Sequence, residues 1–155
     1  MANIAELNIN CGGKPVAGFT GSGATFEELE RLAGDALPAA YVDFIRSADG
    51  GHPEVGCFRV PGGEPDNIVE VDWFYSVANP ELESIRSALE GFGALLGPGA
   101  LPIGRDGGGN QFYLLLSSQP PSVWLYLHDE GGKRIKLADC FEEFISGLIS
   151  NPDFI

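Results

Sequence analysis

Residues 103–145 read IGRDGGGNQFYLLLSSQPPSVWLYLHDEGGKRIKLADCFEEFI, and the fold that we predict depends most on this stretch. The glycine run between Asp106 and Asn110 is typical of a tight turn that joins two strands. Asp139 precedes a segment whose apolar side chains recur at helical spacing, so we expect an amphipathic helix to close the chain. The apolar runs in this part of the chain predict strands near 101–105, 111–117, 122–128 and 134–138.

The sequence upstream of this stretch predicts three further helices and two strands. Helices are expected to begin at Thr25, Pro38 and Asn79, and strands are expected at 57–60 and 68–77. The expected order along the chain is helices, strands, a helix, more strands and a final helix. Strands and helices do not alternate regularly in this order. We therefore predict an α+β fold with an antiparallel sheet of about six strands, flanked by helices.

Length and glycine content predict one domain preceded by an arm. A chain of 155 residues has the size of a single domain. Residues 1–24 are small and rich in glycine, with one short apolar alternation, so a weak strand and a flexible loop are expected there. The expected organisation is a flexible glycine-rich arm over residues 1–24 and one domain over residues 25–155.

The chain is strongly acidic, because 22 acidic residues against 9 basic ones give a net charge of −13. Such a field repels phosphate backbones and anionic lipid headgroups, so neither nucleic acid nor a membrane is an expected partner. It attracts a basic protein, although solubility alone explains the same charge equally well. The N-terminus does not resemble a signal peptide, and no apolar run is long enough to span a membrane. We therefore expect a cytoplasmic protein.

No set of residues predicts catalysis or metal binding. The loop at 104–109 lacks the Lys and the Ser or Thr of a phosphate-binding loop, and it leads into a strand instead of a helix. A thiol enzyme built on Cys140 and His128 needs the two side chains within hydrogen-bonding reach, and a structural thiol is the interpretation that we favour. The three cysteines show no zinc-ligand spacing. We expect no catalytic residue, cofactor or metal, and keep an enzyme that acts on a small molecule as a minor alternative.

Side-chain alternation in the expected strands predicts a surface for a partner protein. In the strand at 122–128, Val123 and Leu125 would face the helices, which places Trp124 and Tyr126 on the opposite face. Aromatic rings bury a large area at low entropic cost, and carboxylates pair with the Arg and Lys side chains of a partner. If helices cover both faces, the same rings are ordinary core, and a register shift of one residue would exchange the faces. The expected partner-binding residues are Glu70, Asp72, Asp106, Tyr113, Trp124, Tyr126, His128, Asp129 and Glu130.

Three groups of residues in the chain match the order and spacing of motifs from one protein superfamily. They are Leu37–Pro38 with Tyr41, Phe44, Ile45 and Asp49–Gly50–Gly51; Ile103–Gly104 with Asp106 and Gly109–Asn110; and Leu137–Ala138 with Phe141, Phe144 and Leu148. On these residues, over roughly positions 25–150, the chain resembles the SUKH superfamily. Asp49, Asn110 and Cys140 stand where Asn, an acid and Ser are usual.

The resemblance implies both a fold and a class of function. The SUKH superfamily unites fungal regulators of cell-wall assembly with bacterial toxin-immunity proteins, and it implies a twisted antiparallel sheet and non-enzymatic protein binding. The expected function is therefore that of an immunity protein that binds and neutralises a cognate secreted toxin, often a nuclease. The alternative is an intracellular regulatory or scaffold module that binds a host protein. The matching residues belong to the core and to turns, so no functional residue is transferred from the family.

Overall fold

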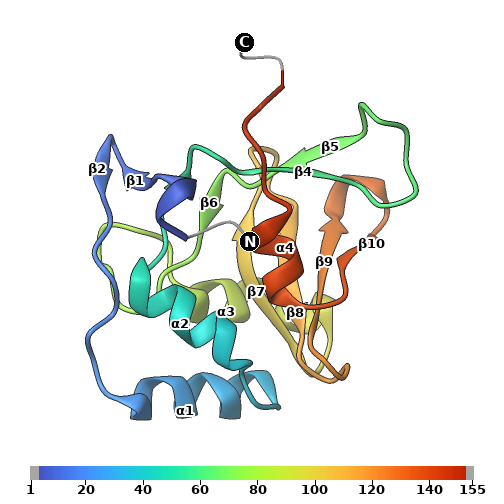
Figure 1. Ribbon diagram of the computed structural model, residues 1–155. Helices are drawn as coiled ribbons and strands as arrows, with labels where there is room; N and C mark the ends of the chain where they lie inside the picture. Colours follow the sequence, from blue (N-terminus) through green and yellow to red (C-terminus); the bar gives the residue numbers. More distant parts are fainter. Residues whose placement is uncertain (1–3, 153–155) are drawn as a thin grey trace.

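The computed structural model describes residues 4–152, which form four helices, ten short strands and two 3-10 helices (Figure 1). The 3-10 helices are at Ile4–Leu7 and His128–Glu130. The other elements, in chain order, are β1 (Ile9–Cys11), β2 (Lys14–Pro15), α1 (Gly23–Ala33), α2 (Ala39–Ser47), β3 (His52–Pro53), β4 (Cys57–Arg59), β5 (Ile68–Glu70), β6 (Trp73–Phe74), α3 (Ile85–Leu96), β7 (Ala100–Arg105), β8 (Gln111–Leu115), β9 (Ser122–Leu127), β10 (Lys133–Ala138) and α4 (Phe141–Ser146).

Five strands form the main sheet in the spatial order β10-β9-β8-β7-β6, and each neighbouring pair is antiparallel. Within residues 4–152 there are two smaller sheets, β2-β1-β3 and β4-β5, which are antiparallel as well. The α+β class and the antiparallel pairing are confirmed. The strands are divided among three sheets, whereas the sequence predicted one sheet of about six strands.

The division of the sheet arises within the expected strand at 68–77. β5 ends at Glu70 and pairs with β4, whereas β6 begins at Trp73 and pairs with β7. Between them the Asp72 N–H donates to the Arg105 carbonyl at 2.8 Å, so the chain has already joined the main sheet at this residue. The sequence does not reveal the change, because both short strands keep the same alternation of side chains.

The helices α2 and α4 pack on one face of the main sheet, and their buried side chains belong to the larger of two core clusters (Figure 1). Phe44 of α2 lies edge-on to Phe74 of β6, with ring centroids 4.9 Å apart. Phe144 of α4 lies 6.0 Å from Phe112 of β8. All four rings are buried, and burial of a side chain of this size contributes roughly 1.5–3 kcal/mol. These rings therefore join the two helices to the sheet.

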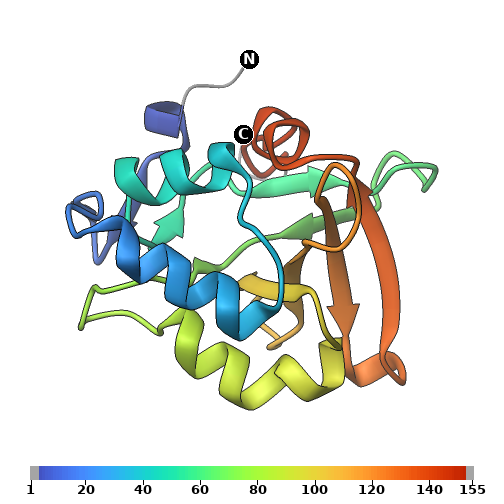
Figure 2. The same ribbon diagram turned by 90° about the horizontal axis from the view of Figure 1, so that it is seen from below.

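The helix α3 covers part of the opposite face of the main sheet. Its Leu96 packs against Ala100 and Tyr113, and Trp124 and Tyr126 lie at the margin of this second cluster. The helix α1 runs beside α3, away from the sheet (Figure 2). The sheet therefore has helices on both faces, although α3 leaves the margin near Trp124 and Tyr126 partly open.

The segment from residue 4 to residue 24 packs against the domain. Leu7, Ile9 and Phe19 are buried and belong to the main core cluster. β1 pairs with both β2 and β3, and the Phe19 ring lies edge-on to Phe26 of α1 at 5.2 Å. The sequence suggested a separate arm because this segment is rich in glycine. In the structure, three buried apolar side chains and the pairing of β1 with β3 attach it to the domain.

The motif Asp49–Gly50–Gly51 connects the end of α2 to the segment that follows β6. The buried Asp49 carboxylate accepts hydrogen bonds from the Val77 N–H at 2.6 Å and the Ala78 N–H at 3.0 Å. Gly50 has φ of 82°, and a Cβ at this position would lie 2.9 Å from the Ser76 Cβ. Both features allow two backbone segments to approach closely, so this motif is a structural one.

Candidate functional site

The end of the main sheet at which β7 turns into β8 gathers polar side chains around Arg105. The guanidinium of Arg105 lies 3.4 Å from Asp72 Oδ2 and 2.9 Å from Glu83 Oε1, and it donates to the Asp106 carbonyl at 3.3 Å. We call this region the turn-end surface. It consists of His52, Asp72, Trp73, Glu83, Arg105, Asp106, His128, Asp129 and Glu130.

The Asp106 side chain holds the turn between β7 and β8. One carboxylate oxygen accepts the N–H groups of Gly108 and Asn110, both at 2.9 Å. The other accepts the side-chain amide of Asn110 at 2.9 Å. Gly109, with φ of 86°, supplies the left-handed conformation that the turn requires. The glycine run of the sequence therefore forms a turn with three side-chain hydrogen bonds, as a strand-to-strand connection and without a helix N-terminus.

His128 ties the end of β9 to the same turn. Its main-chain N–H donates to Asn110 Oδ1 at 3.0 Å, and its ring Nε2 lies 2.7 Å from the Gly108 carbonyl. Because a carbonyl oxygen only accepts, this contact assigns the proton to Nε2. Asp129 and Glu130 follow in a 3-10 helix and are exposed. Two acidic side chains are thus presented beside the turn by a backbone that is held at His128, directly before them.

The other side of Arg105 carries two rings and a cleft. The Nδ1 atom of His52 donates to the Asp72 carbonyl at 2.6 Å, and the rings of His52 and Trp73 are 5.7 Å apart. Both side chains are half-buried. A cleft of about 230 Å³ lies next to them, lined by Cys11, Trp73, Phe74, Glu81, Leu82, Glu83 and Arg105. The cleft is small and mixed in polarity, so it suits a side chain of a partner better than a cofactor.

The turn-end surface is negatively charged. Five carboxylates, on Asp72, Glu83, Asp106, Asp129 and Glu130, accompany the single guanidinium of Arg105. Beneath them, the Tyr75 hydroxyl donates to Gln111 Oε1 at 2.6 Å, and burial raises the pKa of Tyr75 to about 12. Tyr75 therefore stays a neutral donor near neutral pH and adds no charge to the surface.

The turn-end surface contains five of the nine residues that we expected to bind a partner. They are Asp72, Asp106, His128, Asp129 and Glu130. Glu70 lies in the separate β4–β5 sheet, where its carboxylate accepts a hydrogen bond from the Cys57 thiol at 3.2 Å. It belongs to a different sheet because the chain changes sheets directly after it.

The structure corrects the expected surface at Tyr113 and leaves Trp124 and Tyr126 partly exposed. Tyr113 is only 1% exposed, because α3 covers it, and so it cannot contact a partner. Trp124 and Tyr126 are half-buried, and the guanidinium of Arg134 lies 5.5 Å from the centre of the Tyr126 ring. The same guanidinium donates to the Leu96 carbonyl of α3 at 2.8 Å. The rings therefore border a basic side chain and a helix, and they do not mix with the carboxylates.

Four residues of the turn-end surface were missing from the expected set, namely His52, Trp73, Glu83 and Arg105. Arg105 directly precedes Asp106 and is an isolated basic residue in an acidic chain, which is a signal that could have identified it. Trp73 reaches the surface through the change of sheet, Glu83 through the loop before α3, and His52 through the short strand β3. Sequence periodicity does not report such tertiary approaches.

The structure also bears on metal ligands, thiols and membrane-spanning helices within residues 4–152. This range contains no group of three or more His, Cys, Asp or Glu side chains placed to hold a metal ion. The three cysteines of this range form no disulfide bond with one another, and Cys140 is the residue that precedes α4. None of its helices combines the length and the apolar character that crossing a membrane requires.

Comparison with known proteins gives two matches. The profile of the SMI1/KNR4 family (SUKH-1) matches residues 21–147. A protein of Bacillus subtilis (strain 168), named SPbeta prophage-derived uncharacterized protein YokK, is 24% identical over 165 residues, and the alignment covers 96% of this chain and 84% of that protein. The range of the profile match includes the whole turn-end surface, from His52 to Glu130.

Proposed function

The chain belongs to the SMI1/KNR4 family (SUKH-1), and on this basis we propose that it is an immunity protein that binds and neutralises a cognate secreted toxin. The turn-end surface is the proposed contact. The observation that carries the proposal is the set of five carboxylates on the turn-end surface, two of which pair with the single guanidinium of Arg105, in a chain of net charge −13. The similar Bacillus subtilis protein is named as prophage-derived, which agrees with a gene carried on a mobile element.

In the proposed mechanism, different residues speed the association with the toxin and slow its release. The carboxylates steer a basic toxin toward the surface, and such steering raises association rates to ~10⁸–10⁹ M⁻¹s⁻¹ at low salt. Trp73 and His52 at the edge of the cleft then exclude water from the contact, which slows release. The backbone at Asp129 is fixed through His128, so little ordering is needed when the partner binds.

A nuclease toxin would be neutralised because its active site must carry positive charge. A nuclease holds the phosphate backbone of its substrate with Lys and Arg side chains. An acidic surface that pairs with the same side chains excludes the substrate from the active site. In this mechanism the immunity protein needs no catalytic group of its own.

The test uses the product of the gene next to the one that encodes this chain. We expect that product to be lethal alone, harmless with this chain, and captured with it in a pull-down from cells that express both. The variant Asp129→Lys/Glu130→Lys should associate at least about tenfold more slowly at low salt, because two attractive charges become repulsive. A control variant, Glu27→Lys/Asp43→Lys, changes the net charge equally on exposed positions of α1 and α2 and should associate at nearly the normal rate.

Two results would contradict the proposal. An association rate that is indifferent to salt and to the Asp129→Lys/Glu130→Lys change would exclude the steering mechanism. A harmless neighbouring gene product, together with capture of a housekeeping protein through the same surface, would favour a regulatory or scaffold module instead.

A further inference from the structure

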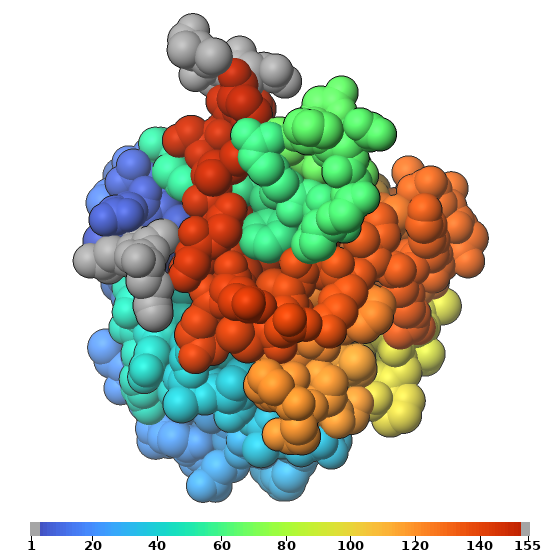
Figure 3. All heavy atoms as spheres, turned by 45° about the vertical axis from the view of Figure 1, so that its right-hand side comes forward, coloured from blue at the N-terminus to red at the C-terminus, as the bar shows by residue number. Residues whose placement is uncertain are grey.

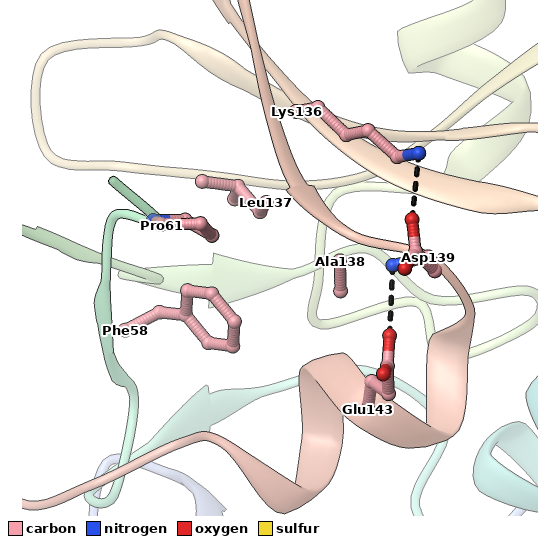
Figure 4. A pocket seen from close by; sticks show the side chains of 7 residues that line it. All are labelled: Phe58, Pro61, Lys136, Leu137, Ala138, Asp139 and Glu143. Atoms are coloured by element: carbon pink, nitrogen blue, oxygen red, sulfur yellow. Dashed lines mark hydrogen bonds and ion pairs between the residues drawn. The ribbon is translucent and has the colours of Figure 1, made fainter. Parts of the chain in front are cut away.

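A groove of about 430 Å³ lies between the β4–β5 hairpin and the outer edge of the main sheet. In Figure 3 the hairpin (green) stands beside the β9–β10 hairpin (orange) and α4 (red) on the face brought forward. The residues that line the groove are Phe58, Pro61, Lys136, Leu137, Ala138, Asp139 and Glu143 (Figure 4). Its walls are mostly apolar, with the Phe58 ring on one side and Ala138 and Leu137 on the other. The turn-end surface shares no residue with this groove.

The strand β10 forms one wall of the groove and is also an open edge. Among residues 4–152 it pairs with β9 alone and ends the main sheet, and it lies at the outer right of Figure 1. Its six residues span about 20 Å. An edge strand presents alternate N–H and C=O groups to its surroundings, and these groups can pair with one further strand.

This edge is the most basic segment of an acidic chain. Lys133, Arg134 and Lys136 are three of the nine basic residues of the whole sequence. The register with β9 places Arg134 and Lys136 on the same face as Tyr126 and Trp124. Lys136 makes an exposed ion pair with Asp139 at 2.6 Å, which solvent screens, so it remains able to exchange partners.

The charges of β10 decide which kind of strand the edge accepts. A second copy of this chain would place Lys and Arg opposite Lys and Arg, which is destabilising across a sheet. An acidic strand places opposite charges there. Residues on its other face would point to the apolar groove between Phe58 and Leu137, so an alternation of acidic and apolar side chains fits both sides of the edge.

We propose that the open edge of β10 binds an extended acidic segment of a partner protein as an added strand, with the apolar side chains of that segment in the groove. This surface is separate from the turn-end surface and has the opposite charge. The proposal does not depend on toxin neutralisation, because its chemistry selects acidic peptides and the turn-end surface selects basic proteins.

The probe is an acetylated peptide of ten alternating Glu and Val residues, added to the full chain at up to millimolar concentration. We expect changes in the amide NMR signals to concentrate in β10 and at Phe58–Pro61, and binding to weaken as salt is raised. A peptide with Lys in place of Glu should not bind. The same acidic peptide with N-methylated Val residues should not bind either, because it lacks the N–H groups that pair with the strand.

A charge-reversed protein tests the residues directly. Lys136→Glu should weaken binding of the acidic peptide about fivefold or more, while Lys14→Glu, with the same change of net charge on an exposed position of β2, should bind like the unchanged protein. Circular dichroism and melting temperature confirm that both variants are folded. The proposal would be overturned if the acidic peptide did not bind, or if the Lys peptide did. It would also be overturned if the signal changes centred on the turn-end surface, or if the two variants bound the acidic peptide equally.

Discussion

Two aspartates hold loops by the same chemistry in opposite surroundings. The Asp49 carboxylate accepts the N–H groups of Val77 and Ala78, and the Asp106 carboxylate accepts those of Gly108 and Asn110. Asp49 is only 5% exposed and lies beside the core, whereas Asp106 is partly exposed on the turn-end surface. Both residues belong to short motifs rich in glycine.

The difference concerns what replaces the carboxylate when it is removed. N–H groups that face a buried acceptor have less access to water when that acceptor is removed, so they bear more of the cost of desolvation. N–H groups near the surface can bind water instead. We therefore expect the Asp49 motif to determine the stability of the fold and the Asp106 motif to determine the shape of the turn-end surface.

Asp49→Ala should be among the most damaging changes. Two hydrogen bonds to a charged, buried acceptor are lost, and the part-buried N–H groups of Val77 and Ala78 lose their partner, which together cost about 3 kcal/mol of unfolding free energy. Asp49→Asn keeps one oxygen acceptor and should lose about half as much by the same reasoning. Urea denaturation at pH 7 measures both values. Equal stability of the Ala variant and the unchanged protein would show that the loop after β6 does not need this anchor.

Gly50 and Gly109 have nearly equal positive φ values, but only Gly50 is crowded by neighbouring atoms. Comparing their Ala variants therefore distinguishes the cost of backbone strain from the cost of crowding. Gly50→Ala should cost about 3 kcal/mol, since its Cβ would meet Ser76 at 2.9 Å in addition to the penalty for positive φ. Gly109→Ala should cost only about 1–2 kcal/mol, because the nearest atom, His128 Nε2, is 3.6 Å away. The comparison is made by thermal melting of both variants. Similar losses would mean that crowding at Gly50 is relieved by movement of Ser76.

Asp106→Ala should have a smaller effect on stability and a larger one on the surface. The loss of unfolding free energy should be about 1.5 kcal/mol, because water replaces the carboxylate at the turn. The amide NMR signals of Asn110, His128 and Asp129 should shift, since Asn110 connects the turn to the end of β9. Unchanged signals at His128 and Asp129 would show that the turn does not position the acidic residues.

The sequence identified local features of the fold better than their tertiary arrangement. The strands at 111–117 and 122–128 and the helix after Asp139 were predictable, because alternation and helical spacing act within a few residues. Helix starts were less accurate: the third helix begins at Ile85 with Ser84 as its cap, and Asn79 caps a turn before it. Asn and Ser are equally good caps, so local preference could not choose between the two starts.

The candidate site was only partly predictable for a related reason. Asp106, His128, Asp129 and Glu130 lie together because two strands and one turn connect them, and adjacent strands are visible in the sequence. Tyr113 has the same alternation as Trp124 but is covered by α3, whose position depends on its packing against β7. Which part of a sheet face a helix covers is a tertiary property, and so it is not encoded in the period of the strand.

Tyr41→Phe should have the smallest effect and concerns a third buried polar group, near Asp49. The Tyr41 hydroxyl is buried and has no hydrogen-bond partner among residues 4–152. Removal of an unpaired buried hydroxyl should change the unfolding free energy at pH 7 by less than about 1 kcal/mol, in the stabilising direction. A loss of more than that amount in urea denaturation would indicate a partner for the hydroxyl, such as a buried water.

The same variant should change how stability depends on high pH. Burial, and then the Asp49 carboxylate, raise the pKa of Tyr41 above its ordinary value of 10.0. Above pH 10 the unfolded chain therefore releases a proton that the folded chain keeps, so stability is complete below this pH and is lost as the pH rises. Each such tyrosine contributes a decline of about 1.4 kcal/mol per pH unit. Urea denaturation between pH 9 and pH 11 should show a shallower decline for Tyr41→Phe, and parallel curves would mean that Tyr41 ionises equally easily in the folded protein.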